Sequence, residues 1–476
     1  MLRSIFWDFF GKVFYQAVGL IISIFLARIL TPEEFGLIGM ALVVVHMSEV
    51  YLDLGFGAAL IQKKSITNEL YSTVFWFNII MGIVLTLIVF MLSPVIADFY
   101  KRDELVGIVK VFSGLFFVSS FGVVQNIQLT KGLDFKSLSL INLVGVVIGG
   151  GGGVVFALLG YGVWALVVQH FFSRVVIVVL SWYVSKWRPI FYFNINEVKD
   201  IWSFSSKKFI DTILTSLFNS LDLVLVGKVL NANQLGYYNR AKSLNILLKE
   251  YLSSSLMKVL FPYISGIQDD KEKVIKVYQD VKGVVTILSF GVTAIVYLSA
   301  DLIILTLFSE KWLGSVIYFK MLLLSTFFIP INAIIQNIVV GLGYMSLRLK
   351  AGLVVKFFRL LSLMLGYLFG VEVFLYLTVI VGFISLLINF VCVRKVLGMS
   401  LVDQLLSIVI NALFVGLMIV CLNWISVDVS SILISFVKSF VFVFFYMIWV
   451  KVMFKNKYLI IEKVVVSLFY KVRGDV

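Results

Sequence analysis

Charged residues are scarce in this sequence. Only 14% of the 476 residues are Asp, Glu, Lys or Arg, whereas 61% are hydrophobic. A soluble domain is close to half apolar and about a quarter charged. The chain therefore has too little polar surface to cover a soluble fold, which excludes the ordinary classes of soluble protein.

Cysteine and histidine are rarer still, with two residues of each type. Cys392 and Cys421 lie in apolar runs, where free cysteines are usually small buried hydrophobes. Together with the histidines they form no metal-ligand spacing, so we expect no metal site. The pattern GxxxxGK[ST] is also absent, which excludes a P-loop ATPase. We expect no cofactor and no catalytic residue.

Long apolar runs dominate the sequence. A helix that crosses a bilayer needs about 20 apolar residues, and fourteen segments are candidates. They lie at about 9–30, 35–56, 73–97, 105–129, 138–159, 162–184, 202–226, 235–261, 282–308, 316–342, 351–370, 372–393, 402–424 and 430–453. We therefore predict an all-α integral membrane protein with about fourteen spans. The alternative is twelve or thirteen, because the two pairs around positions 160 and 371 have almost no loop between them.

The first apolar run and the loop at 265–281 each carry a separate prediction. The first apolar run contains Lys12 and Gln16 and lacks a small-residue cleavage site, so we expect the mature chain to begin at Met1. The segment 265–281 has apolar residues at helical spacing with charges between them. This pattern predicts a short amphipathic helix at the cytoplasmic surface.

Basic residues predict the orientation in the membrane. The formal net charge is +14, yet the predicted outer segments hold only Lys101, Arg102, Lys228 and Lys311. The predicted cytoplasmic segments hold most of the other lysines and arginines that lie outside the spans. Because cytoplasmic loops are enriched in these residues, we expect both termini in the cytoplasm and an even number of spans. The charge does not indicate nucleic-acid binding, because no soluble basic domain is present.

A short motif occurs twice at an offset of 200 residues. Residues 28–36 are RILTPEEFG and residues 228–236 are KVLNANQLG. The pattern Gln-Asn-Ile also recurs, at 125–127 and 336–338. Each half starts on the same side, so the repeat predicts two parallel six-helix bundles. We predict a first bundle at 1–184, a cytoplasmic linker at 185–201, a second bundle at 202–395, two additional spans at 396–454, and a basic amphipathic cytoplasmic tail at 455–476.

These features together resemble a known superfamily. Two segments resemble the MOP exporter superfamily, and within it the Wzx-type polysaccharide flippases. They are FLARILTPEEFGLIGMA near the start and LDLVLVGKVLNANQLGYYNRAKSL in the second half. The resemblance implies transfer of undecaprenyl-pyrophosphate-linked oligosaccharide across the bacterial cytoplasmic membrane. It also implies contact with membrane lipids, a polysaccharide polymerase and chain-length machinery.

Cations within the spans are the first candidates for a site. A charge at mid-membrane costs roughly 2.5–3.5 kcal/mol on insertion scales, so such residues usually face a cavity or a partner. The repeat places Lys12 in correspondence with Lys207 and Lys208, which predicts facing walls of a cationic cleft that binds pyrophosphate. The alternative is that these side chains extend to the cytoplasmic interface. Arg240, His170 and Arg174 are further cationic candidates for the cleft; for the last two, a structural hydrogen-bond cluster is the alternative.

Opposite charges recur at matched positions. Glu49 and Lys249 are related by the offset of 200, with Asp53 and Glu250 beside them. We predict an ion pair between the bundles that acts as a gate, with ion pairs inside each bundle as the alternative. Asp211 and Asp222 share one helix face and are candidates for ion coupling, or for neutralising nearby lysines.

Neutral and small residues complete the list of candidates. Gln125, Asn126, Gln336 and Asn337 are candidates for contacts with sugar hydroxyls, or for bonds between helices. Arg28 and Lys228 either receive a headgroup on release or bind carbonyls at the C-termini of helices. The glycine run at 149–153 predicts close helix packing or a kink.

Two other functions fit this sequence less well. A cation-coupled multidrug exporter of the MATE type would need an acidic cavity, whereas the candidates here are mostly basic. A membrane-bound polysaccharide polymerase usually needs large outer loops, but every predicted outer connection is shorter than about a dozen residues.

Overall fold

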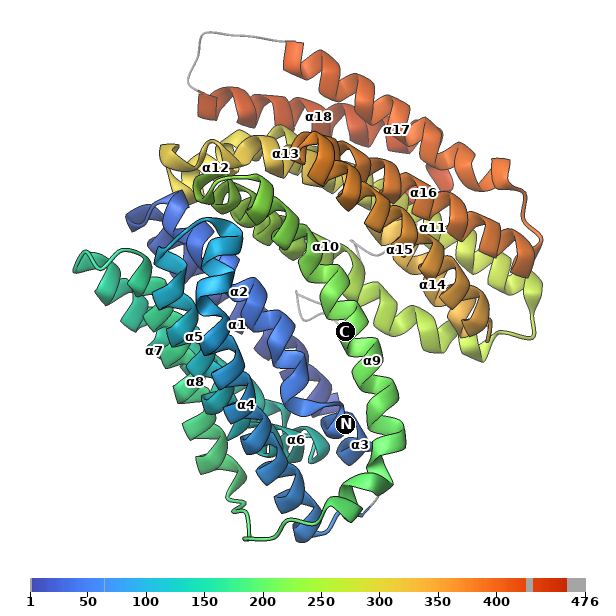
Figure 1. The fold of residues 1–476 in the computed structure, drawn as a ribbon. Coiled ribbons are helices and arrows are strands. Elements are labelled where there is room, and N and C mark those ends of the chain that lie inside the picture. The colour runs from blue at the N-terminus through green and yellow to red at the C-terminus, as the bar shows by residue number, and fades with distance from the viewer. Residues whose placement is uncertain (1, 64, 425–430, 460–476) are drawn as a thin grey trace, which may run out of the picture. The chain divides into compact units, whose positions relative to one another are not determined.

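The computed structural model describes residues 2–63, 65–424 and 431–459, and within these ranges it contains helices and no strand. Figure 1 shows the course of the chain. The elements are α1 (Leu2–Ile29), α2 (Pro32–Asp53), α3 (Phe56–Gln62), α4 (Asn68–Tyr100), α5 (Glu104–Ser120), α6 (Val123–Lys131), α7 (Phe135–Leu158), α8 (Val163–Ser185), α9 (Ile195–Val229), α10 (Ala232–Gly266), α11 (Lys271–Leu298), α12 (Ala300–Phe308), the 3₁₀ turn η1 (Glu310–Trp312), α13 (Ser315–Thr326), α14 (Ile329–Gly341), α15 (Met345–Phe369), α16 (Val371–Leu397), α17 (Leu401–Trp424) and α18 (Ser431–Met453).

The structure confirms a multi-span helical membrane protein. Eleven of the described helical segments are long and apolar enough to cross a membrane, or twelve if the bent pair of α5 and α6 forms one span. Helices α9 and α10 coincide with the predicted spans at 202–226 and 235–261 and have 35 residues each, but they are not among the eleven. The count of fourteen therefore stays a prediction.

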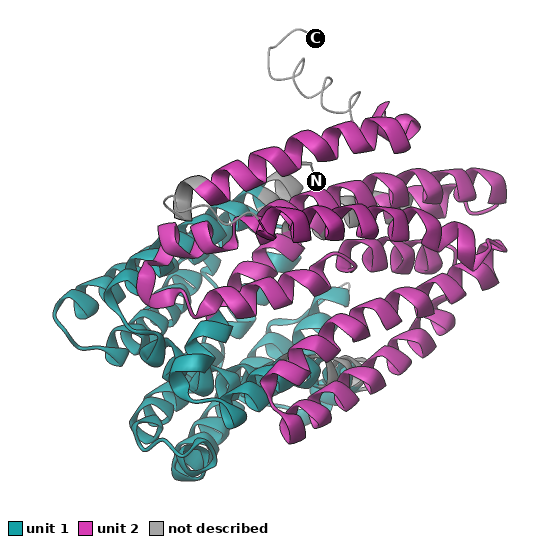
Figure 2. Ribbon diagram, turned by 90° about the horizontal axis from the view of Figure 1, so that it is seen from above, with its two compact units in different colours: residues 1–239 teal, residues 240–476 magenta. Residues whose placement is uncertain are grey.

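The chain divides into two compact units, 1–239 and 240–476, coloured separately in Figure 2. Helix α9 packs against α2, α3 and α4 in unit 1. The division thus falls within α10, whereas the predicted linker between bundles lies at 185–201. The predicted amphipathic helix at 265–281 corresponds largely to the first turns of α11, which continues without a break into a span.

In unit 1, α7 packs against both α8 and α1. The glycine run of α7 serves this packing, because α7 continues through it without a break. A Cβ atom at Gly149 would lie 2.6 Å from the backbone carbonyl oxygen of Gln169 on α8, and one at Gly153 would lie 2.8 Å from the Gln169 side chain. Small residues let helix backbones approach closely in a bilayer, and here they bring α7 and α8 together.

In unit 2, helices α17 and α18 pack against α11. Tyr446 of α18 donates a hydrogen bond of 2.8 Å to the carbonyl oxygen of Ile287 on α11. After α18, Lys457 forms an ion pair with Asp280 of α11. The two helices predicted as additional spans are therefore attached to the core of unit 2 by both apolar and polar contacts.

Two tight connections join neighbouring spans. Gly370 lies alone between α15 and α16 with a φ of +101°, a conformation that glycine adopts at little steric cost. Between α7 and α8, Gly160 and Gly162 also have positive φ angles. These glycines explain how spans that have almost no loop between them can reverse direction.

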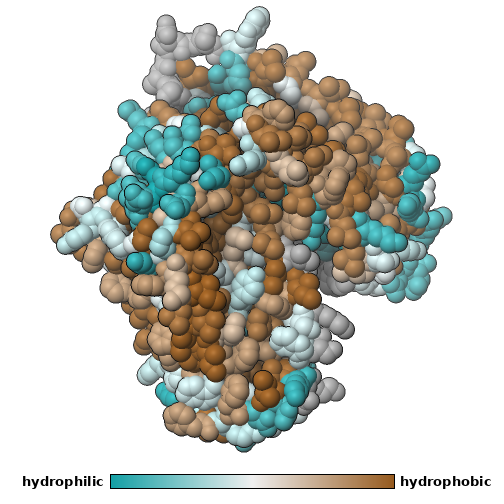
Figure 3. Space-filling view, viewed as in Figure 1, coloured by the Kyte–Doolittle hydropathy of each residue, from teal (hydrophilic) through white to brown (hydrophobic). Residues whose placement is uncertain are grey.

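The outer surface of the helices is apolar. Exposed side chains on α4 include Ile80, Leu87, Met91 and Val95, and Figure 3 shows a hydrophobic surface over this helix with hydrophilic patches toward its ends. A soluble helix would carry polar residues on its exposed face. This surface is therefore suited to contact with lipid chains.

Candidate functional site

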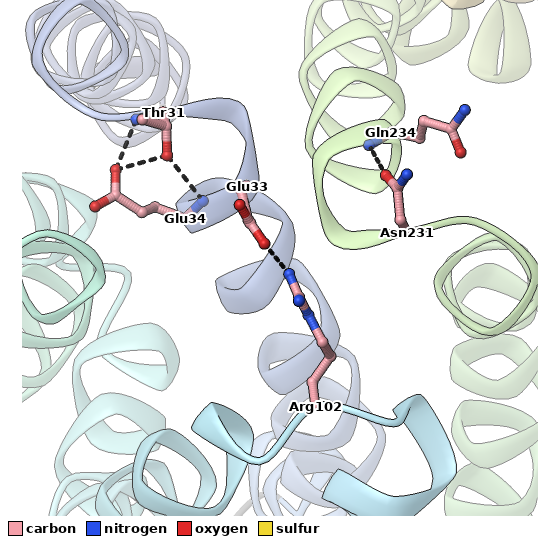
Figure 4. Close-up of polar contacts among 6 residues, drawn as sticks. All are labelled: Thr31, Glu33, Glu34, Arg102, Asn231 and Gln234. Atoms are coloured by element: carbon pink, nitrogen blue, oxygen red, sulfur yellow. Dashed lines mark hydrogen bonds and ion pairs between the residues drawn. The ribbon is translucent and has the colours of Figure 1, made fainter.

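The two copies of the repeated motif begin helices in the same way (Figure 4). Thr31 precedes α2, and its hydroxyl accepts a hydrogen bond from the backbone N–H of Glu34, while the Glu34 carboxylate accepts one from the backbone N–H of Thr31 at 2.6 Å. Asn231 precedes α10, and its side-chain oxygen accepts from the N–H of Gln234 at 2.9 Å. Both copies thus contain an N-cap residue followed three positions later by Glu or Gln.

Glu33 shows where the two copies differ. Glu33 forms an ion pair with Arg102, which lies between α4 and α5, and Figure 4 shows both side chains. The matched residue in the second copy is the uncharged Asn233. The first copy is therefore attached to the α4–α5 connection through a charge that the second copy lacks.

Lys12 lies on the wall of a pocket between α1 and α7. The pocket has a volume of about 350 Å³ and is lined by Gly11, Lys12, Tyr15, Phe135, Leu138, Ser139 and Asn142. Its volume is at the lower end of the range for small-molecule sites. The Ser139 hydroxyl donates to the backbone carbonyl of Trp7 at 3.1 Å, which helps to hold α7 against α1. The wall combines a cation, an amide and two aromatic rings.

The side chains of Lys207, Lys208 and Asp211 lie outside the described residues, although the helix that carries them, α9, is described. Their predicted roles in the cleft and in ion coupling stay predictions.

Glu49 of α2 forms an ion pair with Arg174 of α8 inside unit 1. The imidazole Nδ1 of His46 lies 3.6 Å from the other carboxylate oxygen of Glu49. His170, one turn before Arg174, packs edge-on against the ring of Phe112 with the centroids 6.0 Å apart. Both histidines of the protein thus lie near Glu49 or Arg174.

This arrangement bears on the predicted gate. Glu49 has a partner within its own unit, which is the alternative considered above, whereas Lys249 and Glu250 lie on α10 in unit 2. The Glu49–Lys249 pair stays a prediction. Asp53 has a local role, because its carboxylate accepts from the backbone N–H of Gly57 at 2.8 Å in the first turn of α3.

Arg240 is buried among aromatic rings in unit 2. Its guanidinium carbon lies 4.8 Å from the centroid of Phe308 and 5.1 Å from that of Trp312, and only 6% of the residue is exposed. Contacts of this kind between a guanidinium and aromatic faces are favourable when desolvated. In this structure Arg240 takes part in the packing of unit 2.

Asp222 is a buried carboxylate with a hydrogen-bond donor. The hydroxyl of Tyr238 on α10 donates to Asp222 Oδ2 at 3.1 Å, and both residues are buried. Lys228 also has a defined place: it donates to the carbonyl of Phe99 at the end of α4 and lies 4.4 Å from the centroid of the Phe99 ring. Binding of a helix C-terminus was one of the two roles predicted for Lys228.

The recurring Gln-Asn pairs differ between the two units. Gln125 is fully buried in unit 1, and Asn126 accepts from the Ser181 hydroxyl of α8 at 3.3 Å. In unit 2, Gln336 accepts from Arg348 of α15 at 2.7 Å, whereas Asn337 donates to Ala333 within α14 at 3.1 Å. Asn126 and Gln336 thus join helices, which is the predicted alternative to sugar binding.

Several residues near the candidate site were not found from the sequence. They are His46, Tyr238, Ser139 and Asn142. The sequence could have identified His46, because it lies three residues before Glu49 on a predicted helix and therefore on the same helix face. The others depend on how helices pack, and no local signal identifies them.

Residues 25–317 match the model of a family described as polysaccharide biosynthesis protein. The chain belongs to this family. Among curated members of similar sequence, the teichuronic acid biosynthesis protein TuaB of Bacillus subtilis (strain 168) is 29% identical over 271 residues, which cover 56% of each chain. The lipopolysaccharide biosynthesis protein WzxC of Escherichia coli (strain K12) is 25% identical over 408 residues, which cover 84% of this chain and 82% of WzxC. The match with TuaB thus spans little more than half of that protein.

The fold of this family member is found in solved transporters. A structure of the lipid II flippase MurJ in an inward closed conformation aligns with a TM-score of 0.74 and 13% identity, and covers 94% of this chain and 99% of MurJ. An inward-facing multidrug resistance MATE transporter of the MOP superfamily aligns with a TM-score of 0.56 and 15% identity. The alignment covers 87% of this chain and 96% of the MATE transporter. The similarity confirms an all-α transporter fold of the kind seen in MurJ and the MATE transporter, whereas the predicted arrangement in two six-helix bundles plus two helices stays a prediction.

Proposed function

We propose that this protein is a flippase that moves undecaprenyl-pyrophosphate-linked oligosaccharide units across the bacterial cytoplasmic membrane for polysaccharide biosynthesis. Relatives named for teichuronic acid and lipopolysaccharide biosynthesis and the fold shared with a lipid II flippase support this function. The cargo class combines an anionic headgroup, sugars and a long apolar chain.

The observation that carries the proposal is the Lys12 pocket. Lys12 lies within an apolar helical segment, Phe10–Ile29, that is long enough to span the membrane. It lines a pocket of about 350 Å³ with Tyr15, Phe135 and Asn142. Ammonium groups bind phosphate through charge-assisted hydrogen bonds, aromatic faces pack against sugar rings, and an amide can both donate and accept. The pocket therefore has the chemistry of a pyrophosphate joined to its first sugar.

Arg174 supplies a second cation in the same unit. Its partner Glu49 is 28% exposed at the side chain, and Arg174 itself is 38% exposed. A pyrophosphate carries more charge than one carboxylate and also accepts bidentate bonds from arginine. We propose that the headgroup competes with Glu49 for Arg174, and that this exchange shifts the balance between inward and outward conformations. Lys207, Lys208, Lys249 and Arg240 remain proposed members of the cationic path.

We propose that α9 carries the residues that couple transport to an ion gradient. Asp222 is buried and accepts a hydrogen bond from Tyr238, so a proton or a sodium ion bound at this carboxylate would remove a buried charge. Asp211 is the second proposed coupling residue.

We also propose that both termini lie in the cytoplasm and that a polysaccharide polymerase with its chain-length machinery acts together with this protein.

The multidrug exporter is the second candidate, since the MATE fold also aligns. Its cationic substrates need acidic cavity walls, but Lys12 is the charged residue that lines the pocket between α1 and α7. We therefore favour an anionic cargo.

Deletion of the gene in the native host tests the function. We expect undecaprenyl-linked oligosaccharide to accumulate on the cytoplasmic leaflet and surface glycan to be lost. Complementation with wild type should restore both, Lys12→Ala should restore them poorly, and Lys199→Ala, which changes an exposed lysine outside the pocket, should restore them fully. Normal surface glycan without accumulation would refute the proposal and favour drug export.

A further inference from the structure

A bent span in unit 1 contains buried polar groups that the protein itself leaves unsatisfied. Helices α5 and α6 meet at Phe121 and Gly122 with a bend of 46°. Close to this break lie Asn78 of α4 and Gln125 of α6, and both are 0% exposed. Neither amide oxygen and neither amide nitrogen has a hydrogen-bond partner among the described residues.

Asn78 faces the break. On α4 it lies between Phe75, three residues before it, and Gly82, four residues after it, so the three share one helix face. The Phe75 ring lies 6.2 Å from the ring of Phe121, centroid to centroid, and a Cβ atom at Gly82 would lie 2.8 Å from the Ser120 side chain. The face that carries Asn78 therefore packs against the last residues of α5 and the break itself.

Gln125 belongs to the same packed region. It lies in the first turn of α6, between Val124 and Ile127, and these two residues form one hydrophobic cluster with Phe75 and Ile79 of α4. The first N–H groups of a helix have no partner within the helix, and the N-cap residue of α6, Gly122, has no side chain to cap them. Buried donors and acceptors from α4 and α6 thus lie beside the same break.

The corresponding break in unit 2 is built differently. Between α13 and α14, the Ser289 hydroxyl donates to the carbonyl of Phe327 at 2.9 Å. The amide of Asn389 donates to that of Asn332 on α14 at 2.7 Å. In unit 2 the amides beside the break satisfy each other, whereas in unit 1 they do not.

We infer that the break between α5 and α6 is a binding site for ordered water, held by the side chains of Asn78 and Gln125. An unsatisfied buried polar group costs about 1–3 kcal/mol. Two amides without hydrogen-bond partners would therefore lower the free energy of unfolding by a large fraction of its value in a typical domain. Water both donates and accepts, and buried waters typically make about three hydrogen bonds to such groups. The full burial of both amides excludes a ligand as large as a sugar in this conformation.

Hydroxyl-radical footprinting by X-rays tests the site in the purified full-length protein without added cargo. Radicals form from water, so a buried side chain is labelled efficiently only when water lies beside it. Phe75 and Phe290 form a matched pair, because each is 2% exposed and each lies beside one of the two breaks. We expect several-fold faster labelling of Phe75 than of Phe290, with uptake of ¹⁸O from labelled water. Equal, slow labelling of the two rings would overturn the inference.

A double variant gives an independent result. Asn78→Leu with Gln125→Leu keeps the number of side-chain heavy atoms to within one at each position and removes the hydrogen-bonding groups. If water occupies the site, labelling of Phe75 should fall to the rate of Phe290, and the thermal midpoint should not rise. A higher thermal midpoint with unchanged labelling would show that the amides are unsatisfied in the native protein and would refute the site. The wild-type comparison stands even if the variant fails to fold.

Discussion

Gly36 and Gly236 are related by the repeat and make reciprocal contacts in unit 1. A Cβ atom at Gly36 would overlap the backbone carbonyl of Ala232, and one at Gly236 would overlap that of Pro32. Pro32 and Ala232 are themselves separated by the repeat offset of 200. The two motif copies therefore pack as a two-fold symmetric pair would, in which residue i contacts j and j contacts i.

Replacing either glycine by alanine should disrupt this contact. Alanine favours a helix over glycine by up to about 1 kcal/mol, but overpacking against rigid backbone costs about 1–3 kcal/mol, so the clash should dominate. We expect Gly36→Ala and Gly236→Ala each to lower the thermal midpoint and reduce transport. The control is Gly151→Ala on α7, where a Cβ atom would meet open space; a similar loss there would contradict the packing explanation.

The N-cap of α2 should contribute measurably to stability. Thr31→Ala removes the hydroxyl that accepts from the Glu34 N–H, and loss of such a cap costs about 1 kcal/mol. Thermal unfolding in detergent should show the loss, while Thr31→Ser should retain most of the stability. If Thr31→Ser and Thr31→Ala lower the thermal midpoint equally, the hydroxyl does not stabilise the helix.

Charge exchange identifies the partner of Glu49. Glu49→Arg and Arg174→Glu should each impair transport and destabilise unit 1, because each places like charges together. Breaking the pair should cost roughly 1–3 kcal/mol, between the values for exposed and buried pairs. The double exchange should restore part of the activity. The same design with Glu49→Lys and Lys249→Glu tests the gate predicted between bundles, and better rescue there would favour the gate over the pair seen inside unit 1.

Lys12 should affect cargo binding more than folding. Lys12→Gln is expected to weaken binding of a lipid-linked pyrophosphate by roughly tenfold, the lower range for a charge-assisted bond, because Lys12 is exposed to solvent. Lys12→Arg should bind nearly as well as wild type. Affinity measured at two salt concentrations provides the check, since a phosphate contact weakens with salt. Unchanged affinity in Lys12→Gln would remove Lys12 from the site.

Asp222 should couple transport to an ion gradient. Asp222→Asn can still accept a hydrogen bond from Tyr238 but no longer carries a charge. We expect transport in proteoliposomes to continue without responding to an imposed proton or sodium gradient. Tyr238→Phe should keep the response and lose about 1.5–3 kcal/mol of stability, the range for a hydrogen bond to a charged group. A normal gradient response in Asp222→Asn would assign coupling to another residue.

Local patterns in the sequence predicted much of this protein. Apolar runs of bilayer length predicted the helices because each span satisfies its own backbone. Thr31 and Glu34, or Asn231 and Gln234, lie three residues apart, a spacing typical of a helix start, whereas the spans predicted from hydrophobicity began at 35 and 235. Family resemblance then indicated the cargo class.

Packing decided what lies between helices. Glu49 pairs with Arg174, 125 residues away, although the repeat had suggested Lys249. Gln125 and Gln336 occupy matched positions, yet Gln336 accepts a hydrogen bond from Arg348, whereas the amide of Gln125 has no partner among the described residues. Spacing along one helix fixes which residues share a face, but the rotation and approach of neighbouring helices fix which faces meet. Those are set by many weak contacts across the whole unit, which no local segment of the sequence contains.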